Sequence, residues 1–393
     1  MVTPRLAPGA NLAAVRKARG LKQEQLARKA SISVSLLSKI EVGDRTLTPE
    51  VAALMARAIG ITMAEVLGTA PVEINMEAEL LALRSAVRDY DLPETREVDE
   101  RTIARDLKAV GLYRDSVDID RLMPALPGYV RNATAHAFAA NTAQSWAALS
   151  DMYSAVYWLA ARHRWMDMAE LAVTRQRWAV EQKRNPLAAA VAARDRAGAY
   201  LNSGSLDKGL TIVDRAIAAA QNGLSGQQRA FAIGVLNLRG MTLAGRIEDK
   251  REAKQEAARH IKSAWKAADE FGADHTLHNM IFGPGNTVTH LLATQVDLGQ
   301  PQEAVRVAAD LDAALTGLPP VRVAASRINL ARAQLDLGDR DGALENLATA
   351  WGAAPQMARL NPMGQEVFRV LTSLHKRSNA RLLALSKLSG VEL

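Results

Sequence analysis

Apolar side chains recur with the spacing of a helix along almost the whole chain of 393 residues. They stand three or four residues apart, which places them on one side of an α-helix. The alternation of apolar and polar residues that marks a half-buried strand is not found. Glycine and proline divide the pattern into segments of about ten to twenty residues. The sequence therefore predicts an all-α protein without strands.

One short stretch, LKQEQLARKASISVSLLSKIEV at Leu21–Val42, stops the helical pattern at Ala30 and restarts it at Ser33. Two short helices joined by a turn of three or four residues form a helix-turn-helix. Leu26 and Ala27 are expected to face the core from the first helix. Ala27 must be small, because the second helix crosses close to it.

The second helix of this stretch is expected to pack through Leu37 and Ile40, while Ile32 fills the turn. Ser33 is the predicted N-cap, since its hydroxyl can accept a hydrogen bond from a free N–H group of the first turn. Ser31 lies in the turn itself. If the backbone there takes a positive φ, serine costs roughly 1 kcal/mol relative to glycine.

The opposite side of the second helix is polar and suits contact with DNA. Its hydroxyl groups can hydrogen-bond base edges in the major groove, and Val34 can touch a thymine methyl. Lys22, Lys39 and Arg45 flank the helix and can neutralise phosphates. Gln23 opens the preceding helix, where backbone N–H groups and its amide can hold a phosphate. The predicted DNA-binding residues are Lys22, Gln23, Ser33, Val34, Ser35, Ser38, Lys39 and Arg45.

The charge distribution favours nucleic acid as a partner. The chain has a formal net charge of +7, and residues 1–67 hold ten Lys or Arg against five Asp or Glu. Most of the positive excess therefore lies around the predicted helix-turn-helix. A basic segment of this kind is attracted to the phosphate backbone of nucleic acid.

Residues 9–68 resemble the Cro and repressor family of helix-turn-helix proteins, with five helices near 11–19, 22–30, 33–41, 49–59 and 62–67. The closing segment IGITMAEVLG is similar to the family's fifth helix. The family often pairs an arginine of helix 1 with a glutamate that ends helix 3, so the resemblance implies a structural ion pair of Arg16 with Glu41. Ser31 replaces the usual glycine of the turn, and Lys22 replaces the usual Thr or Ser cap. The resemblance implies a DNA-binding domain.

The rest of the chain contains a repeated pattern. A glycine ends one helix, and a small residue follows five positions later in the next helix. Small residues allow two antiparallel helices to approach closely, and the glycine permits a left-handed turn between them. This is the logic of tetratricopeptide (TPR) repeats, which have a period of about 34 residues. Weaker repeats cover 153–177 and 228–271, and a plain helical bundle is the alternative. In the three clearest repeats, the helix-ending glycine and the small residue five positions later are Gly204 with Gly209, Gly299 with Ala304, and Gly338 with Ala343.

These patterns divide the chain into three parts. Residues 1–68 form the predicted DNA-binding domain, and the segment GTAPVEIN at 68–75 marks its end. Residues 69–100 form a linker and connecting helix, and the charged segment DLPETREVDERTIARD is expected to be an exposed connection. Residues 101–393 form a TPR-like helical domain for ligand sensing, dimerisation or both.

The inner face of a TPR solenoid comes from the first helix of each hairpin. Aligning the repeats by their small residues places a set of polar residues on that face. Asn286 and His290 are four residues apart and hence neighbours on one helix. An asparagine amide donates and accepts together, which suits a peptide backbone, and such a ladder resembles TPR-type peptide-receptor regulators. The predicted ligand-binding residues, for a peptide or a small molecule, are Arg194, Asn202, Asn237, Asn286, His290, Asn329 and Arg332.

Other chemistry is weakly represented. His275 and His278 would share a helical face, but no Asp, Glu or Cys completes a set of metal ligands, so neither a metal site nor a cofactor is expected. No catalytic triad, P-loop or dinucleotide loop is present, which argues against an enzyme. Trp146, Tyr153 and Tyr157 lie on one helical stripe and are expected to pack in the core, with the wall of a ligand pocket as the alternative.

The chain has no cysteine, which excludes disulfides and suits a cytoplasmic protein. The N-terminal segment lacks the apolar run of a signal peptide, and no segment is long and apolar enough to span a membrane. A cytoplasmic protein without membrane contact is therefore expected.

The whole chain resembles a group of actinobacterial regulators with this head and a TPR-like domain, most of all at FGPGNTVTHLLATQVDLGQPQEAVRVA, residues 282–308. The resemblance implies a transcription regulator whose helical domain dimerises, senses a ligand, or does both. One recognition helix reads only a few base pairs, so we expect a homodimer on a palindromic operator. A TPR interaction scaffold or an antitoxin-like partner protein is the alternative.

Overall fold

The structure is a computed structural model, and it describes residues 7–18, 21–59, 63–67, 76–374 and 380–389. The chain forms two compact units, which divide between Met76 and Glu77. We call residues 1–76 the head and residues 77–393 the body. The boundary segment 68–75 lies outside the described residues. The predicted all-α class is confirmed, because helices make up most of the described chain and strands very little of it.

The described residues of the head form five short helices, as the sequence predicts. They are α1 (Pro8–Ala18), α2 (Gln23–Lys29), α3 (Val34–Val42), α4 (Pro49–Ile59) and α5 (Met63–Val66). Leu26 and Ala27 of α2 are buried together with Leu37 and Ile40 of α3, in a core that also holds Leu12 of α1. The helix-turn-helix therefore packs as its spacing indicates.

The turn between α2 and α3 has the predicted geometry. Ser31 has a φ of 56°, in the left-handed region that favours glycine. The Ser33 hydroxyl accepts a hydrogen bond from the Leu36 N–H at 3.2 Å and caps α3. Gly43 ends α3 with a φ of 94°. Both ends of α3 are thus fixed by local sequence.

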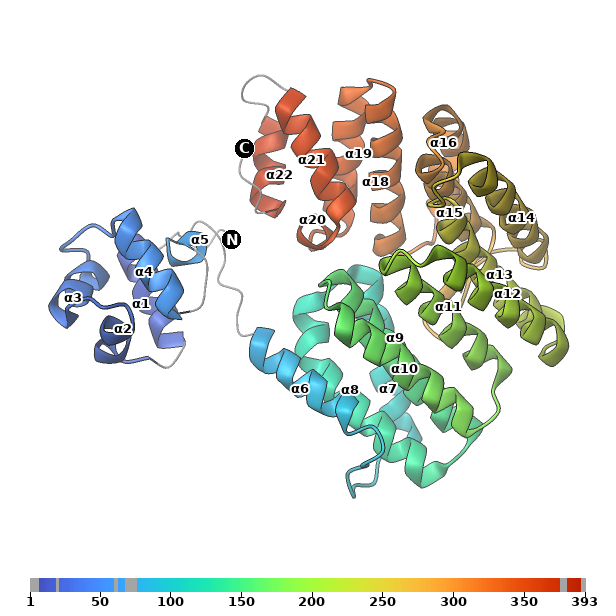
Figure 1. Ribbon diagram of the computed structural model, residues 1–393, viewed down its shortest axis with the longest axis horizontal. Coiled ribbons are helices and arrows are strands. Elements are labelled where there is room, and N and C mark those ends of the chain that lie inside the picture. Colours follow the sequence, from blue (N-terminus) through green and yellow to red (C-terminus); the bar gives the residue numbers. More distant parts are fainter. Residues whose placement is uncertain (1–6, 19–20, 60–62, 68–75, 375–379, 390–393) are drawn as a thin grey trace. The chain divides into compact units, whose positions relative to one another are not determined.

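The body is a series of antiparallel helices (Figure 1). Its first helix α6 (Met76–Arg88) is followed by residues 89–99, which connect to α7. The expected exposed connection is therefore shorter than predicted, because its second half belongs to α7. The helices that follow are α7 (Glu100–Ser116), α8 (Ile119–Ala140), α9 (Ala143–Arg162), α10 (Met166–Gln182), α11 (Pro186–Asn202), α12 (Leu206–Gly223), α13 (Gly226–Ala244), α14 (Lys250–Ala268), α15 (Pro284–Asp297), α16 (Pro301–Val307), α17 (Leu311–Leu315), α18 (Pro320–Asp336), α19 (Arg340–Ala353), α20 (Met357–Leu360), α21 (Pro362–Leu374) and α22 (Ala380–Ser389).

The expectation of no strands was wrong at one place. Strands β1 (His275–Leu277) and β2 (Met280–Phe282) form an antiparallel hairpin in which Thr276 pairs with Ile281. His278 and Asn279 make the turn with positive φ values of 50° and 55°. Three-residue strands are too short for alternation to be recognised in the sequence.

The glycines and small residues of the repeat act as predicted. Gly204, Gly299 and Gly338 have φ values of 75°, 70° and 82°, so each provides the left-handed residue between two helices. At Gly209, a Cβ atom would lie 2.8 Å from the Leu243 side chain of α13. The small residue at Gly209 is thus required by a neighbouring helix, and Ala304 and Ala343 at the equivalent positions are fully buried.

The first and last hairpins of the body also contact each other. Helix α18 packs against α7, and residues of 83–199 share one hydrophobic core with residues of 324–385. The Gln356 side chain accepts a hydrogen bond from the Ile119 N–H at 2.9 Å and donates one to Asp120 at 3.2 Å. The array of hairpins therefore curls back on itself, and a cavity lies inside it.

Candidate nucleic-acid interface and ligand cavity

The outer side of α3 is polar and accessible. Ser35 and Lys39 are exposed, Val34 is 41% exposed, and Ser38 is half-buried. Leu37 and Ile40 occupy the opposite side of the helix in the core, so the exposed residues are free of a packing role. Of the flanking cations, Lys22 and Arg45 are exposed as well. The DNA-binding role of these residues remains a prediction.

Two of the predicted DNA contacts are also engaged within the head. The Ser33 hydroxyl caps α3, and the Gln23 amide nitrogen donates to a Glu41 oxygen at 2.8 Å. These bonds position α3 relative to α2. Gln23 can still offer its second amide hydrogen to a phosphate, but its geometry is fixed by Glu41.

Arg16 and Glu41 form the structural ion pair that the resemblance implied. Arg16 Nε lies 2.6 Å from Glu41 Oε1, and Nη2 lies 2.9 Å from Oε2, so the contact is bidentate. Arg16 Nη1 also donates to the Leu21 carbonyl at 2.6 Å. The hydrogen bond to Glu41 raises the pKa of Arg16 despite its burial. The pair joins α1 to the end of α3.

The cavity of the body has a volume of about 420 Å³. The first helices of successive hairpins, α7, α9, α11, α13, α15 and α18, line it, together with the β-hairpin. Residues from the first and last hairpins therefore meet around one space. Five predicted ligand-binding residues lie in its wall: Arg194, Asn202, His290, Asn329 and Arg332.

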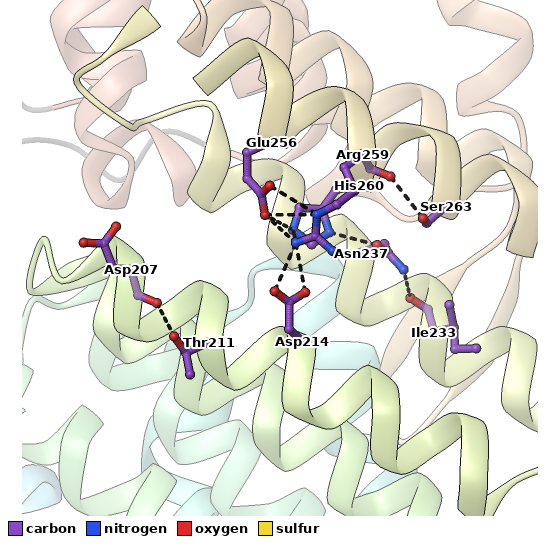
Figure 2. Close-up of polar contacts among 9 residues, drawn as sticks. All are labelled: Asp207, Thr211, Asp214, Ile233, Asn237, Glu256, Arg259, His260 and Ser263. Atoms are coloured by element: carbon purple, nitrogen blue, oxygen red, sulfur yellow. Dashed lines mark hydrogen bonds and ion pairs between the residues drawn. The ribbon is translucent and has the colours of Figure 1, made fainter. Parts of the chain in front are cut away.

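The other two predicted residues lie elsewhere, and this corrects the predicted ladder. Asn237 is 1% exposed; its amide nitrogen donates to the Ile233 carbonyl at 2.8 Å, and its oxygen lies 2.8 Å from His260 Nδ1. Figure 2 shows this pair beside Arg259, which bonds Asp214. Asn237 therefore ties α13 to α14, and its buried side chain does not line the cavity.

Asn286 is fully buried in a similar way. Its amide nitrogen donates to the Ile281 carbonyl at 2.7 Å, and its oxygen accepts from the Thr289 hydroxyl at 3.1 Å. Its backbone N–H donates to Asp274. Asn286 thus fastens the β-hairpin to the start of α15. Asn286 is four residues before His290 on the same helix, but His290 lines the cavity and Asn286 does not.

The histidines do not form the helical pair that the sequence suggested. His275 is exposed on β1, whereas His278 lies in the turn and its Nδ1 is 3.0 Å from both Asp151 carboxylate oxygens. Interaction with Asp151 raises the pKa of His278 despite the opposing effect of burial. Burial and the nearby arginines, first Arg322, lower the pKa of His290 well below its usual value, so its imidazole is neutral. In the described part of the chain, no group of three acidic or histidine side chains is arranged to hold a metal ion.

The aromatic stripe has both of the expected roles. Trp146 and Tyr153 are buried in the core. Tyr157 is buried too, but it also lines the cavity together with Trp158. The Arg162 guanidinium lies over the Trp158 ring, 3.7 Å from its centroid.

Sequence reasoning missed the arginines that dominate the cavity wall. Arg114 and Arg322 come from α7 and α18, which are far apart in the chain and meet only because the array curls back. Arg239 stands in a mostly apolar part of its helix, residues 230–244. A charged residue within that apolar run was the available signal. The missed residues are Arg114, Arg162, Arg239, Arg246 and Arg322.

The family comparison concerns the head. A helix-turn-helix family model matches residues 12–66. Residues 12–66 are a helix-turn-helix domain. This match covers the packed core of the head, α3 included, and agrees with the Cro and repressor resemblance. No curated protein sequence matches the chain significantly.

Several solved structures are similar over most of the chain, at low identity. One is Bacillus thuringiensis PlcR in complex with the peptide PapR7 and DNA, with 12% identity, a TM-score of 0.27, and coverage of 96% of this chain and 98% of that one. The apo form of the competence regulator ComR from Streptococcus vestibularis has 14% identity, a TM-score of 0.21, and coverage of 67% and 96%. A PrgX/iCF10 complex has 11% identity, a TM-score of 0.23, and coverage of 93% and 95%. TM-scores this low decide nothing about the ligand of this chain.

No helix in the described ranges is long and apolar enough to cross a membrane.

Proposed function

We propose that the protein is a sequence-specific DNA-binding transcription regulator. It binds a palindromic operator as a homodimer, and an effector in the body cavity controls that binding. The observation that carries the proposal is the polar outer side of α3 on a helix-turn-helix domain, where Ser35 and Lys39 are exposed and Ser38 is half-buried. Such a helix fits the major groove, where small hydroxyls reach base edges.

A dimer follows from the small size of the recognition surface. One α3 can read only a few base pairs, and two half-sites about one helical turn apart give useful specificity. An effector that binds between hairpins of the body favours one arrangement of those hairpins over another. The effector can shift the affinity for DNA only as far as its own affinities for the two arrangements differ.

Genome-wide mapping of bound DNA tests the first part, followed by binding titrations of the full chain with the mapped sequence at several salt concentrations. The affinity should fall steeply with salt. Lys39→Ala should lower the log–log slope by roughly one unit, or two in a symmetric dimer. Lys254→Ala is the matched control, because it removes an exposed positive charge from α14.

Light scattering of the protein–DNA complex tests the homodimer. An interaction scaffold without DNA binding would show no salt-dependent affinity for any duplex. An antitoxin-like protein would be recovered from cells with a stoichiometric protein partner. Either result would replace the proposed function.

A further inference from the structure

The cavity of the body carries more positive charge than its own carboxylates balance. Seven arginines and three aspartates line it, which leaves a formal excess of four positive charges. Three of the arginines have carboxylate partners. Arg194 Nη1 lies 2.8 Å from Asp195, while Arg246 and Arg332 share Asp297 at 3.2 and 3.1 Å.

The remaining four arginines have no carboxylate within ion-pair distance among the residues that the structure describes. These four, which we call the arginine cluster, come from α7, α9, α13 and α18. They are Arg114, Arg162, Arg239 and Arg322.

The partners that the arginine cluster does have are neutral. Arg162 donates to the Trp158 carbonyl at 3.3 Å, and Arg322 Nη1 lies 3.4 Å from the neutral imidazole of His290. Two buried nitrogens, Arg114 Nη1 and Arg239 Nε, have no hydrogen-bond partner. Arg114 is only 7% exposed. The structure therefore places donors and charges in the cavity without acceptors for them.

The positive charges of the arginine cluster also repel one another. Burial, with repulsion from neighbouring arginines, lowers the pKa of Arg162 to about 9 and the pKa of both Arg239 and Arg322 to about 10. These values stay above neutral pH, so the guanidinium groups keep their charge. A buried, uncompensated charge is unfavourable for folding. A group of them around a cavity indicates a site whose ligand supplies the opposite charge.

We propose that the cavity binds a small organic anion with at least two negative charges, held by the arginine cluster. The charges belong to phosphate or carboxylate groups, because the planar guanidinium donates two parallel hydrogen bonds to either. The volume of about 420 Å³ suits a small molecule, since ligand cavities span roughly 300–1,000 Å³. Tyr157, Trp158 and Met280 supply an apolar part of the wall for the rest of the molecule. This inference rests on the proposed function only where it identifies the anion with the effector that controls DNA binding.

Calorimetric titration and thermal denaturation of the full chain without DNA test the proposal. Inorganic pyrophosphate represents the phosphate source and citrate the carboxylate source, each at constant ionic strength with sodium chloride as the reference. At least one of the two anions should bind and raise the melting temperature beyond the effect of chloride. The anion that binds more tightly shows whether the ligand carries phosphate or carboxylate groups.

Two variants, Arg239→Met and Arg322→Met, assign the binding to the cluster. Each substitution should lower the affinity for the tighter-binding anion roughly 10-fold or more, since a hydrogen-bonded charge is lost. Neither should lower the melting temperature of the ligand-free protein, because each removes a repelling charge. Two variants are used so that one poorly folded protein does not decide the test. Arg259→Met is the matched control: it removes an arginine that pairs with Asp214 and Glu256 outside the cavity and should leave anion binding unchanged.

Absence of a response to both anions would overturn the proposal. So would a response that persists in both cluster variants, or one that Arg259→Met reduces equally. These experiments contain no DNA. The anion site can therefore be refuted while the proposed DNA-binding function holds, and the reverse.

Discussion

Replacing Glu41 by alanine is expected to destabilise the head without removing a DNA contact. Glu41 accepts the two bonds of Arg16 and one from Gln23, and the side chains of the ion pair are only 8% and 6% exposed. Alanine would leave the Arg16 guanidinium buried without its carboxylate, while Nη1 keeps its hydrogen bond to the Leu21 carbonyl. Breaking a buried pair from one side costs about 3–5 kcal/mol. Because small domains are stable by about 5–15 kcal/mol, the head would lose much of its stability.

Hydrogen exchange of the full chain measures this loss where it occurs. Core amides of α2 and α3, such as those of Leu26 and Leu37, should exchange roughly 100- to 5,000-fold faster, which is the same free energy expressed as an opening equilibrium. Glu50→Ala, at an exposed carboxylate of α4, is the matched control and should change little.

The double variant Arg16→Met with Glu41→Leu should recover much of the protection, since an apolar pair of similar volume often replaces a buried ion pair without loss. DNA affinity of Glu41→Ala should fall only in proportion to unfolding. The reasoning would be refuted if protection were unchanged while DNA binding disappeared, because Glu41 would then act at the DNA surface.

Three further changes have defined outcomes. Ser38→Ala should change the base preference of the protein at a cost of roughly 1–3 kcal/mol per lost contact, with an unchanged circular dichroism spectrum; equal affinity for all base variants of the operator would contradict its place in the groove. Gly234→Ala should lower the melting temperature by an overpacking cost of about 1–3 kcal/mol, because the added Cβ would collide with the Phe282 ring. Burial lowers the pKa of His260 from 6.5 to about 4. The unfolded chain therefore takes up a proton at His260 first, so this residue contributes about 2 kcal/mol less stability at pH 5 than at pH 7. The raised pKa of His278 acts in the opposite direction, so the loss is measured as the difference between unfolding titrations of the native protein and of His260→Gln.

Local features of the head could be predicted from the sequence. Ser33 caps α3 as its position before the helix predicts, and Arg16 pairs with Glu41 as the resemblance to Cro and repressor proteins implies. The repeat glycines could be predicted as well, since a left-handed residue after a helix is a local requirement.

The cavity could be predicted only in part, because its wall depends on contacts far apart in the chain. Repeat alignment identified the helices that face inward, but it could not show that Asn237 already bonds His260 or that Asn286 already bonds Ile281. Arg114 and Arg322 come together through the contact of α7 with α18. No periodicity in a single sequence reports that contact.

The central claim is that a ligand in the arginine-lined cavity controls DNA binding by the head. The most direct measurement is the affinity of the full chain for its mapped operator, with and without the better of the two anions, in the native protein and in Arg239→Met. The anion should change the operator affinity of the native protein and leave that of Arg239→Met unchanged, while both proteins bind DNA equally without anion. An operator affinity that does not change with the anion, or that changes equally in Arg239→Met, would contradict control of DNA binding through the cavity.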